Sequence, residues 1–374
     1  MAKGIFKDLK VIELASVLAG PSVGQFFAEL GAEVIKVENP KTGGDVTRSW
    51  YLPAEERGSV SAYFSCVNWG KKSVMLDITE PMQREQLYRL IQDADIVISS
   101  YKPGDDEKLG VDYEYVRKIN PAIIYGQITG YGALADRVGY DAIIQAEAGF
   151  MSINGEADSL PLKMPVALMD LLAGHQLKEA LLIGYINLLK TGKGSFYTVS
   201  LIEAGLTSLA NQATNYLIAG HQPKQKGSLH PNIAPYGEIL QLPDGRMLML
   251  AIGSDKQFHA LCNILHVKHD ERFNANSDRV KHRRQLLSLL QSAVDSVNPS
   301  DFISALERNH IPAGVIQSVP EAIQLYATHI GLYEGDRLTG LRTYVANSAN
   351  RENDSHLLPP PSPGEHNEDI LPKN

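Results

Sequence analysis

The chain has 374 residues, of which 44% are hydrophobic and 21% charged, and its formal net charge is −8 at pH 7. This length suits two domains, and the acidic balance argues against a nucleic-acid-binding surface. With only two cysteines, Cys66 and Cys262, we expect no disulfide framework and a reducing compartment. The first ten residues carry three lysines but no apolar stretch, which is unlike a secretory signal. We therefore expect a soluble, cytoplasmic protein that binds neither nucleic acid nor membrane.

Short strand patterns alternate with amphipathic helix patterns along residues 11–128. Pro21 suits the first turn of a helix, and Gly31 suits the position after a helix end. The alternation predicts an α/β fold with a parallel, doubly wound, Rossmann-like sheet. Ligands bind such sheets at the carboxyl ends of the strands. Strands are predicted at residues 11–15, 33–37, 73–76, 96–99 and 123–128, and helices at 21–30, 81–92 and 113–119, so the ligand segments would be 16–21, 99–104 and 129–136.

The second half of the chain begins with a long apolar helix pattern at residues 171–189. His175, Lys178 and Glu179 interrupt it, so we expect a buried or interfacial helix and no membrane span. The pattern changes after about residue 220, where a smaller α+β domain is predicted. It would contain a hairpin of strands 237–242 and 247–252 and helices at 256–265, 279–297 and 299–309.

Three motifs that suggest cofactors are incomplete. The turn after the first strand lacks G-x-G-x-x-G, and Pro21 removes an N–H, which argues against a nicotinamide or flavin site. Residues 191–195 resemble a phosphate-binding loop but follow a helix, so a helix C-terminal cap is the simpler explanation. Cys262, His266 and His269 are spaced along one helix face, but no fourth ligand completes a zinc site. We expect no metal.

Asp170 is the most informative residue, because it interrupts the otherwise apolar run A-L-M-D-L-L-A. Burying an unpaired carboxylate costs several kcal/mol, so Asp170 has to cap the following helix or take part in chemistry. An aspartate is a favoured N-cap residue. A helix N-terminus also stabilises a carboxylate as an anion, which suits a nucleophile. From spacing alone, both interpretations stay open.

An ordered set of motifs then identifies a family. The motifs include L-A-G-P-S-V-G, G-A-E-V-I-K-V-E, G-G-D-V-T-R-S-W, K-K-S-V-M-L-D, Y-K-P-G-D-D-E-K-L-G, D-R-V-G-Y-D, H-P-N-I-A-P-Y-G and G-E-H-N-E-D-I-L. Over essentially its whole length the chain resembles the family III CoA-transferases, which share a fold with 2-methylacyl-CoA racemases. The resemblance implies an interlocked homodimer of two ring-shaped chains. The large CoA-binding domain would comprise residues 1–220, with a C-terminal return at 325–374, and the small α+β domain residues 221–324.

The resemblance also implies a reaction. Asp170 would attack the thioester of an acyl-CoA donor, giving a mixed anhydride and then an aspartyl-CoA thioester, and a small carboxylic acid would accept the CoA. No cofactor would be bound permanently, and the coenzyme A thioester would be the substrate. Each active site would lie between the large domain of one chain and the small domain of the other. The motif positions that would contact CoA are Val17, Leu18, Ala19, Leu76, Tyr101, Lys102, Lys108, Arg137, Tyr140 and Asp141.

The chain departs from the family pattern at several positions. Leu18 replaces the glutamine near the acyl group of formyl-CoA transferase, and residues 227–237 replace a glycine-rich lid, which favours a larger or more apolar acyl group than formate or oxalate. Asn39 and Ser100 stand where an arginine and an asparagine are usual. Tyr140 stands where racemases carry an acid/base histidine, and the high ordinary pKa of tyrosine favours the transferase. A racemase and a non-catalytic acyl-CoA-binding protein are the alternatives.

Overall fold

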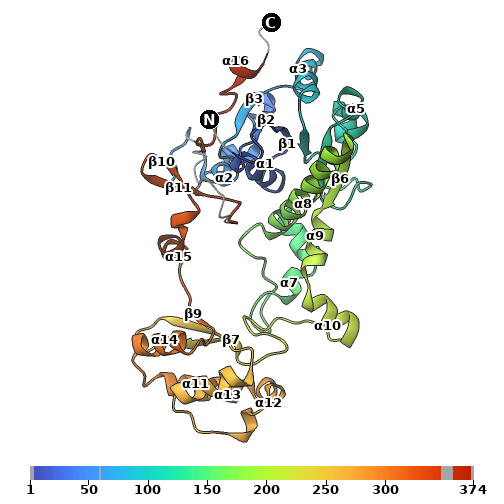
Figure 1. Cartoon of the computed structure of the whole chain (residues 1–374). Helices are drawn as coiled ribbons and strands as arrows, with labels where there is room; N and C mark the ends of the chain where they lie inside the picture. Colours follow the sequence, from blue (N-terminus) through green and yellow to red (C-terminus); the bar gives the residue numbers. More distant parts are fainter. Residues whose placement is uncertain (1–3, 59, 347–356, 372–374) are drawn as a thin grey trace. The chain divides into compact units, whose positions relative to one another are not determined.

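The computed structural model describes residues 4–58, 60–346 and 357–371 of the chain (Figure 1). Two compact units are present. The first comprises Met1–Met151, Lys163–Gln222 and Ala327–Asn374, and the second comprises Ser152–Leu162 and Pro223–Tyr326.

A six-stranded parallel sheet forms the centre of the first unit, in the order β3-β2-β1-β4-β5-β6. Both neighbours of β1 are parallel to it, with Ile12 opposite Ile35 on one side and Val97 on the other. The connections reverse direction between β1 and β4, where a ligand crevice forms in sheets of this kind. The parallel sheet predicted from the sequence is confirmed. Its strands are β1 (Lys10–Leu14), β2 (Glu33–Glu38), β3 (Lys72–Met75), β4 (Ile96–Ser99), β5 (Ile124–Thr129) and β6 (Ser195–Ser200).

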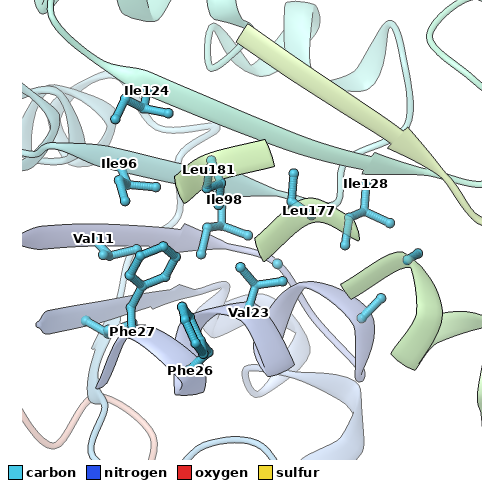
Figure 2. Close-up of a cluster of buried hydrophobic side chains, with 14 of the residues drawn as sticks. Val11, Val23, Phe26, Phe27, Ile96, Ile98, Ile124, Ile128, Leu177 and Leu181 are labelled. Atoms are coloured by element: carbon cyan, nitrogen blue, oxygen red, sulfur yellow. The ribbon is translucent and has the colours of Figure 1, made fainter. Parts of the chain in front are cut away.

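Helices cover both faces of this sheet because the strand side chains alternate between two apolar clusters. On one face, α1 (Ala19–Glu29) and α8 (Leu168–Thr191) pack against the sheet (Figure 2). On the other, Leu87 of α3 (Pro81–Gln92) and Val116 of α5 (Tyr113–Ile119) lie in the second cluster. The first cluster includes Val11, Val23, Phe26, Phe27, Ile96, Ile98, Ile124, Ile128, Leu177 and Leu181, and the second includes Ile12, Leu14, Val97 and Tyr125. Burial of these side chains is the main stabilising contribution to the unit.

The last segment of the first unit runs along β3, at the edge of the sheet. His366 N donates to Ser73 O at 3.0 Å, and Met75 N donates to Asn367 Oδ1 at 2.9 Å. The remaining elements of this unit are η1 (Pro40–Thr42), η2 (Val46–Ser49), α2 (Ala62–Ser65), α4 (Asp105–Leu109), α6 (Asp141–Glu147), α9 (Leu201–Ser208), α10 (Asn211–Ala219), η4 (Ala327–His329), β10 (Gly331–Glu334), β11 (Arg337–Leu341) and α16 (Asn367–Ile370), while α7 (Phe150–Ile153) crosses into the second unit.

The second unit packs helices on a three-stranded antiparallel sheet of order β7-β8-β9. Its core contains Leu248, Leu261 and Leu290, all 1% exposed or less. Residues 279–297 do not form one continuous helix. The helix is interrupted at His282, which ends α12 and precedes α13. The elements are β7 (Tyr236–Gln241), β8 (Met247–Ala251), α11 (Asp255–Ile264), η3 (Glu271–Phe273), α12 (Asn276–Lys281), α13 (Arg283–Val294), α14 (Pro299–Arg308), β9 (Ala313–Val315) and α15 (Val319–Tyr326).

Hydrogen bonds attach residues 152–162 to the second unit, although the sequence placed them in the large domain. Gln225 Nε2 donates to Asn154 O at 2.8 Å, and Gly227 N donates to Gly155 O at 2.8 Å. These contacts join segments far apart in the chain, which no local pattern reports.

The ends of two helices decide how the incomplete phosphate-loop and zinc motifs are interpreted. Helix α8 ends at Thr191, and Gly192 is its C-cap in the left-handed conformation, so 191–195 is a helix terminus. Helix α11 ends at Ile264, so His266 and His269 do not continue the helix face of Cys262. Within the described ranges, no helix combines the length and the apolar character needed to cross a bilayer.

Candidate functional site

Asp170 lies in the first turn of α8, at its third residue, and is 7% exposed. The N-cap of this helix is Ala167, and no side chain caps the helix from that position. Of the two interpretations that the sequence left open for Asp170, the N-cap is therefore wrong. Among the residues that the structure describes, none donates a hydrogen bond to its carboxylate or forms an ion pair with it. An acidic side chain in this position is available to a ligand.

Asp141 supplies the cap that Asp170 does not provide. Its Oδ1 accepts the Met169 N–H at 2.7 Å, and its Oδ2 accepts from Gln145 Nε2 at 2.7 Å. Gln145 Oε1 in turn accepts the Met164 N–H at 2.7 Å. One of the unpaired N–H groups at the start of α8 is thus satisfied from α6. Helix α6 thereby fixes the start of the helix that carries Asp170.

Burial and the charge of Asp141 together raise the pKa of Asp170 to about 7. From the sequence, we expect the helix N-terminus to stabilise the anion. Desolvation and repulsion outweigh that effect, because a helix terminus contributes only about 0.3–1 kcal/mol. A carboxylate with a raised pKa is more basic than usual, and therefore suits a nucleophile or a proton carrier at neutral pH.

Tyr63 of α2 is within electrostatic range of the same carboxylates, and the sequence patterns did not single it out. Burial raises its pKa to about 12, and the charges of Asp170 and Asp141 contribute. Its ring meets the Trp50 ring edge-on at a centroid distance of 4.9 Å. Tyr63 is therefore neutral at physiological pH and brings a hydroxyl donor into this region. The preceding motif, G-G-D-V-T-R-S-W, includes Trp50 and was the available signal.

A glycine in α8 lets the first turn of α1 approach this helix closely. A Cβ atom on Gly174 would lie 3.1 Å from Ala19 O and 2.5 Å from Ser22 Oγ. Gly174 follows Asp170 by four residues, so the two positions share one face of α8. Leu18 is the N-cap of α1, and Val17 has a left-handed backbone with φ of 71°. The start of α1, at Ala19 and Ser22, thus lies against the face of α8 that carries Asp170.

Leu76 directly follows β3, and Tyr101 lies two residues after the end of β4. Leu76 is 2% exposed, and its side chain belongs to the second apolar cluster, so only its backbone is near the strand end. Tyr101 packs against the same cluster, and burial raises its pKa. Tyr101 is half-buried, so part of its surface remains accessible to a ligand.

The two predicted phosphate-binding lysines are engaged in ion pairs. Lys102 Nζ lies 2.5 Å from Asp136 Oδ1, and Lys108 Nζ lies 3.1 Å from Asp105 Oδ1. Asp136 raises the pKa of Lys102. A phosphate that binds these ammonium groups must therefore compete with carboxylates at the protein surface.

Arg137 and Tyr140 lie in the loop that precedes α6. Arg137 pairs with Glu147 at 2.5 Å, and its guanidinium lies 4.2 Å from the centroid of the Tyr131 ring. Tyr140 is the N-cap residue of α6 and is 64% exposed. Of the predicted residues in this region, only Asp141 has its side chain at the start of α8.

Two of the departures from the motif pattern, Asn39 and Ser100, have local structural roles. Asn39 caps η1, where its Oδ1 accepts the Lys41 N–H at 2.9 Å. Ser100 Oγ accepts the Ser16 N–H at 3.2 Å. Ser100 therefore supports the turn that follows β1.

A family model described as CoA-transferase family III matches residues 6–367. The chain belongs to CoA-transferase family III. The family's enzymes use CoA thioesters as substrates, so this transferase is expected to act on an acyl-CoA and a carboxylate.

Named relatives and a solved structure agree with this assignment. A succinate–glutarate CoA-transferase from Agrobacterium fabrum is 39% identical, over 97% of this chain and 94% of the relative. The succinyl-CoA:glutarate CoA-transferase of Mus musculus is 34% identical, over 98% of this chain and 85% of the relative. A crystal structure of a CAIB/BAIF family protein from Brucella suis is 38% identical, with a TM-score of 0.84 over 99% of both chains.

Proposed function

We propose that this CoA-transferase transfers CoA from a dicarboxylic acyl-CoA to a second carboxylate, with Asp170 as the covalent nucleophile. The observation that carries the proposal is a buried carboxylate that caps no helix and has no partner among the described residues. Leaving it unpaired costs free energy that a purely structural role does not recover. Its raised pKa adds basicity where a nucleophile requires it.

The reaction proceeds by exchange of acyl bonds, with electrons conserved at each step. A carboxylate oxygen of Asp170 attacks the thioester carbonyl carbon, and the C–S bond breaks. CoA departs as the thiolate, and the acyl group remains on Asp170 as a mixed anhydride. The thiolate attacks the aspartyl carbonyl of this anhydride and releases the donor acid as a carboxylate. The acceptor carboxylate then attacks the aspartyl-CoA thioester and expels the thiolate, which attacks the acceptor's acyl carbon. The product acyl-CoA forms and the Asp170 carboxylate is regenerated.

The CoA itself is proposed to lie at the crevice where the sheet order reverses. The order β3-β2-β1-β4-β5-β6 is that of the Rossmann fold, which binds dinucleotides there. Val17, Leu18 and Ala19 would contact pantetheine, and Leu76 would do so through its backbone. Tyr101 would stack on adenine, Lys102 and Lys108 would bind phosphates, and Arg137, Tyr140 and Asp141 would lie near the thioester.

An interlocked homodimer is supported by the outward face of α8. Ile183, Ile186 and Leu189 are 60%, 51% and 68% exposed, although the opposite face of the helix is packed on the sheet. A helix that is apolar all round is normally buried on all sides. We propose that a second copy of the chain covers this face, and that its small domain completes the site.

The low cysteine count supports a cytoplasmic setting for the reaction.

The proposed substrates follow from the named relatives together with Leu18. The relatives act on succinate and glutarate, and Leu18 stands where formyl-CoA transferase has a glutamine near its small acyl group. A four- or five-carbon dicarboxylic acyl group is therefore proposed. It is larger than formate, as the sequence predicted, although it is not apolar.

The decisive experiment is intact mass spectrometry of the wild type and Asp170→Asn after incubation with succinyl-CoA or glutaryl-CoA. We expect a CoA or acyl adduct on the wild type only, and its removal by hydroxylamine. CoA binding without any adduct would favour the non-catalytic binder. Deuterium uptake at the α-carbon of a 2-methylacyl-CoA, without exchange between acids, would favour the racemase.

A further inference from the structure

Four buried charged side chains lie beneath the β1–α1 turn, and no step of the proposed reaction uses them. Glu13, Lys36, Asp45 and Lys71 are each at most 6% exposed. Lys36 Nζ lies 2.9 Å from both Glu13 Oε1 and Asp45 Oδ2, and Lys71 Nζ lies 2.7 Å from Glu13 Oε2. Ion pairs seldom recover the full cost of desolvating their charges. Stability alone is therefore a weak explanation for this cluster.

Two members of the cluster bind the backbone of the turn, and a third binds the first turn of α1 directly after it. Lys36 Nζ donates to Ala15 O at 2.7 Å, and Lys71 Nζ donates to Pro21 O at 2.8 Å. Between them, the Asp45 carboxylate accepts the Val17 N–H at 3.2 Å. The turn is thus held at its start and its middle, and the helix that follows it is held at its first turn, by side chains from different segments.

The middle contact is made at a strained position. Val17 has φ of 71°, a left-handed backbone that a β-branched side chain rarely adopts. Such conformations persist only where the surroundings over-determine them, and they concentrate at ligand sites. Asp45 is itself rigid, because it also accepts from Thr47 N at 3.1 Å and Thr47 Oγ1 at 2.8 Å.

We propose that Asp45 is a positioning residue that, with Lys36 and Lys71, clamps the β1–α1 turn in the conformation that receives CoA. This inference rests on the proposed function, because that function assigns the turn to CoA. The clamp acts through the Val17 N–H and leaves the reacting atoms to Asp170.

The charges within the cluster are consistent with a clamp that stays ionised. The Lys36 ammonium lowers the pKa of Asp45 despite burial. The carboxylates of Glu13, Asp45 and the nearby Glu38 raise the pKa of Lys36 despite its burial. Asp45 therefore remains a charged acceptor for the Val17 N–H over the physiological pH range. Burial lowers the pKa of Lys71 to about 8, so Lys71 is the weaker cationic contact.

The test is a double-mutant cycle between Asp45 and Val17. Asp45→Asn keeps the side-chain shape but removes the charge that holds the strained N–H. We expect KM for the acyl-CoA to rise about ten-fold, with a smaller change in kcat. A ten-fold change corresponds to the free-energy cost of holding one residue in a strained conformation. Glycine adopts a positive φ without strain. In a Val17→Gly background, Asp45→Asn should therefore change KM by less than about three-fold.

A matched control uses the opposite end of the same strand. Asp95 Oδ2 accepts the Lys10 N–H at 2.8 Å where β1 begins, so Asp95→Asn also removes a carboxylate that binds a backbone amide. We expect it to leave KM unchanged. Hydrogen–deuterium exchange of the peptide spanning residues 15–22 supplies a readout that needs no substrate. Exchange there should accelerate in Asp45→Asn and not in Asp95→Asn.

The outcomes separate the clamp from the proposed function. Unchanged KM and unchanged exchange in folded Asp45→Asn would overturn the clamp. Equal KM effects of Asp45→Asn in both backgrounds would show that strain at Val17 is irrelevant, and would also overturn it. If the wild type bound no CoA and transferred none, the proposed function would fail, and a clamp for CoA would fail with it. If hydrogen–deuterium exchange at residues 15–22 still accelerated in Asp45→Asn in that case, Asp45 would hold the turn for structural reasons alone.

Discussion

Asp141 Oδ1 accepts the backbone N–H of Met169 at 2.7 Å, which makes Asp141 the cap of the helix that carries Asp170. The same carboxylate raises the pKa of Asp170 through its charge. One side chain therefore both positions the proposed nucleophile and increases its basicity.

Asp141→Asn should separate these two effects, because asparagine retains an acceptor oxygen and loses the charge. The pKa of Asp170 is raised to about 7, so kcat/KM should fall as the pH drops below neutrality. Without the repulsion from Asp141, we expect this acidic limb to move to lower pH. A pH profile of kcat/KM measures the shift. An unmoved limb would mean that another group controls the profile.

Asp170→Asn should increase stability in a pH-dependent way. The folded-state pKa of about 7 lies above the ordinary 3.8, so the folded wild type binds more protons than the unfolded chain between these values. Raising the pH through that window therefore destabilises the wild type and leaves the amide variant unaffected. We expect the stability of the variant relative to the wild type to increase with pH, up to about 4 kcal/mol above neutrality. Urea unfolding at pH 4 and pH 8 tests this, and a pH-independent difference would contradict it.

Gly174→Ala should push α8 away from the start of α1. The added Cβ would lie 2.5 Å from Ser22 Oγ and 3.1 Å from Ala19 O. We expect a loss of about 1–3 kcal/mol in the free energy of unfolding and a higher KM for acyl-CoA. Gly314→Ala is the control, since nothing lies within 4 Å of its Cβ position. Equal effects of the two substitutions would rule out a close approach at Gly174.

Lys102 and Asp136 offer a test of phosphate binding. Their ion pair at 2.5 Å is exposed, so a CoA phosphate has to displace the carboxylate. We expect Asp136→Asn to lower KM by about two- to five-fold and Lys102→Met to raise it, with both effects weaker at high salt. Lys72→Met is the control, because Lys72 pairs with Glu33 in a partly exposed ion pair. Unchanged KM in both test variants would remove Lys102 from the phosphate site.

The exposed apolar face of α8 predicts a dimer. Light scattering should give a mass twice the 41.0 kDa of one chain. Replacing Ile186 and Leu189 together by lysine should prevent assembly and activity, whereas Met82→Lys, at a position 77% exposed on α3, should do neither. A wild-type mass of one chain would contradict the interlocked dimer.

The local elements of the large domain followed directly from residue patterns. Helices Pro81–Gln92 and Tyr113–Ile119 and strand Ile96–Ser99 begin and end where the sequence predicted. Their apolar residues repeat with the helix or strand period, and proline and polar residues mark the boundaries. The prediction of one helix over 279–297 was wrong, because the helix is interrupted at His282. The apolar spacing continues across this interruption, so the sequence pattern did not reveal it.

The candidate site was partly predictable from the sequence and partly visible only in the tertiary structure. A lone acid in an apolar run was enough to single out Asp170, and the motif resemblance selected the turn at Val17–Ala19. The sequence could not show that Asp141 caps α8, that Tyr63 lies near Asp170, or that Asp45 binds the Val17 N–H. Periodicity and capping preferences act over one or two turns of chain, so the sequence alone determined the elements and the candidate nucleophile. Only the tertiary structure decided the neighbours and charge environment of that nucleophile, because strand order and helix packing bring together residues from separate segments.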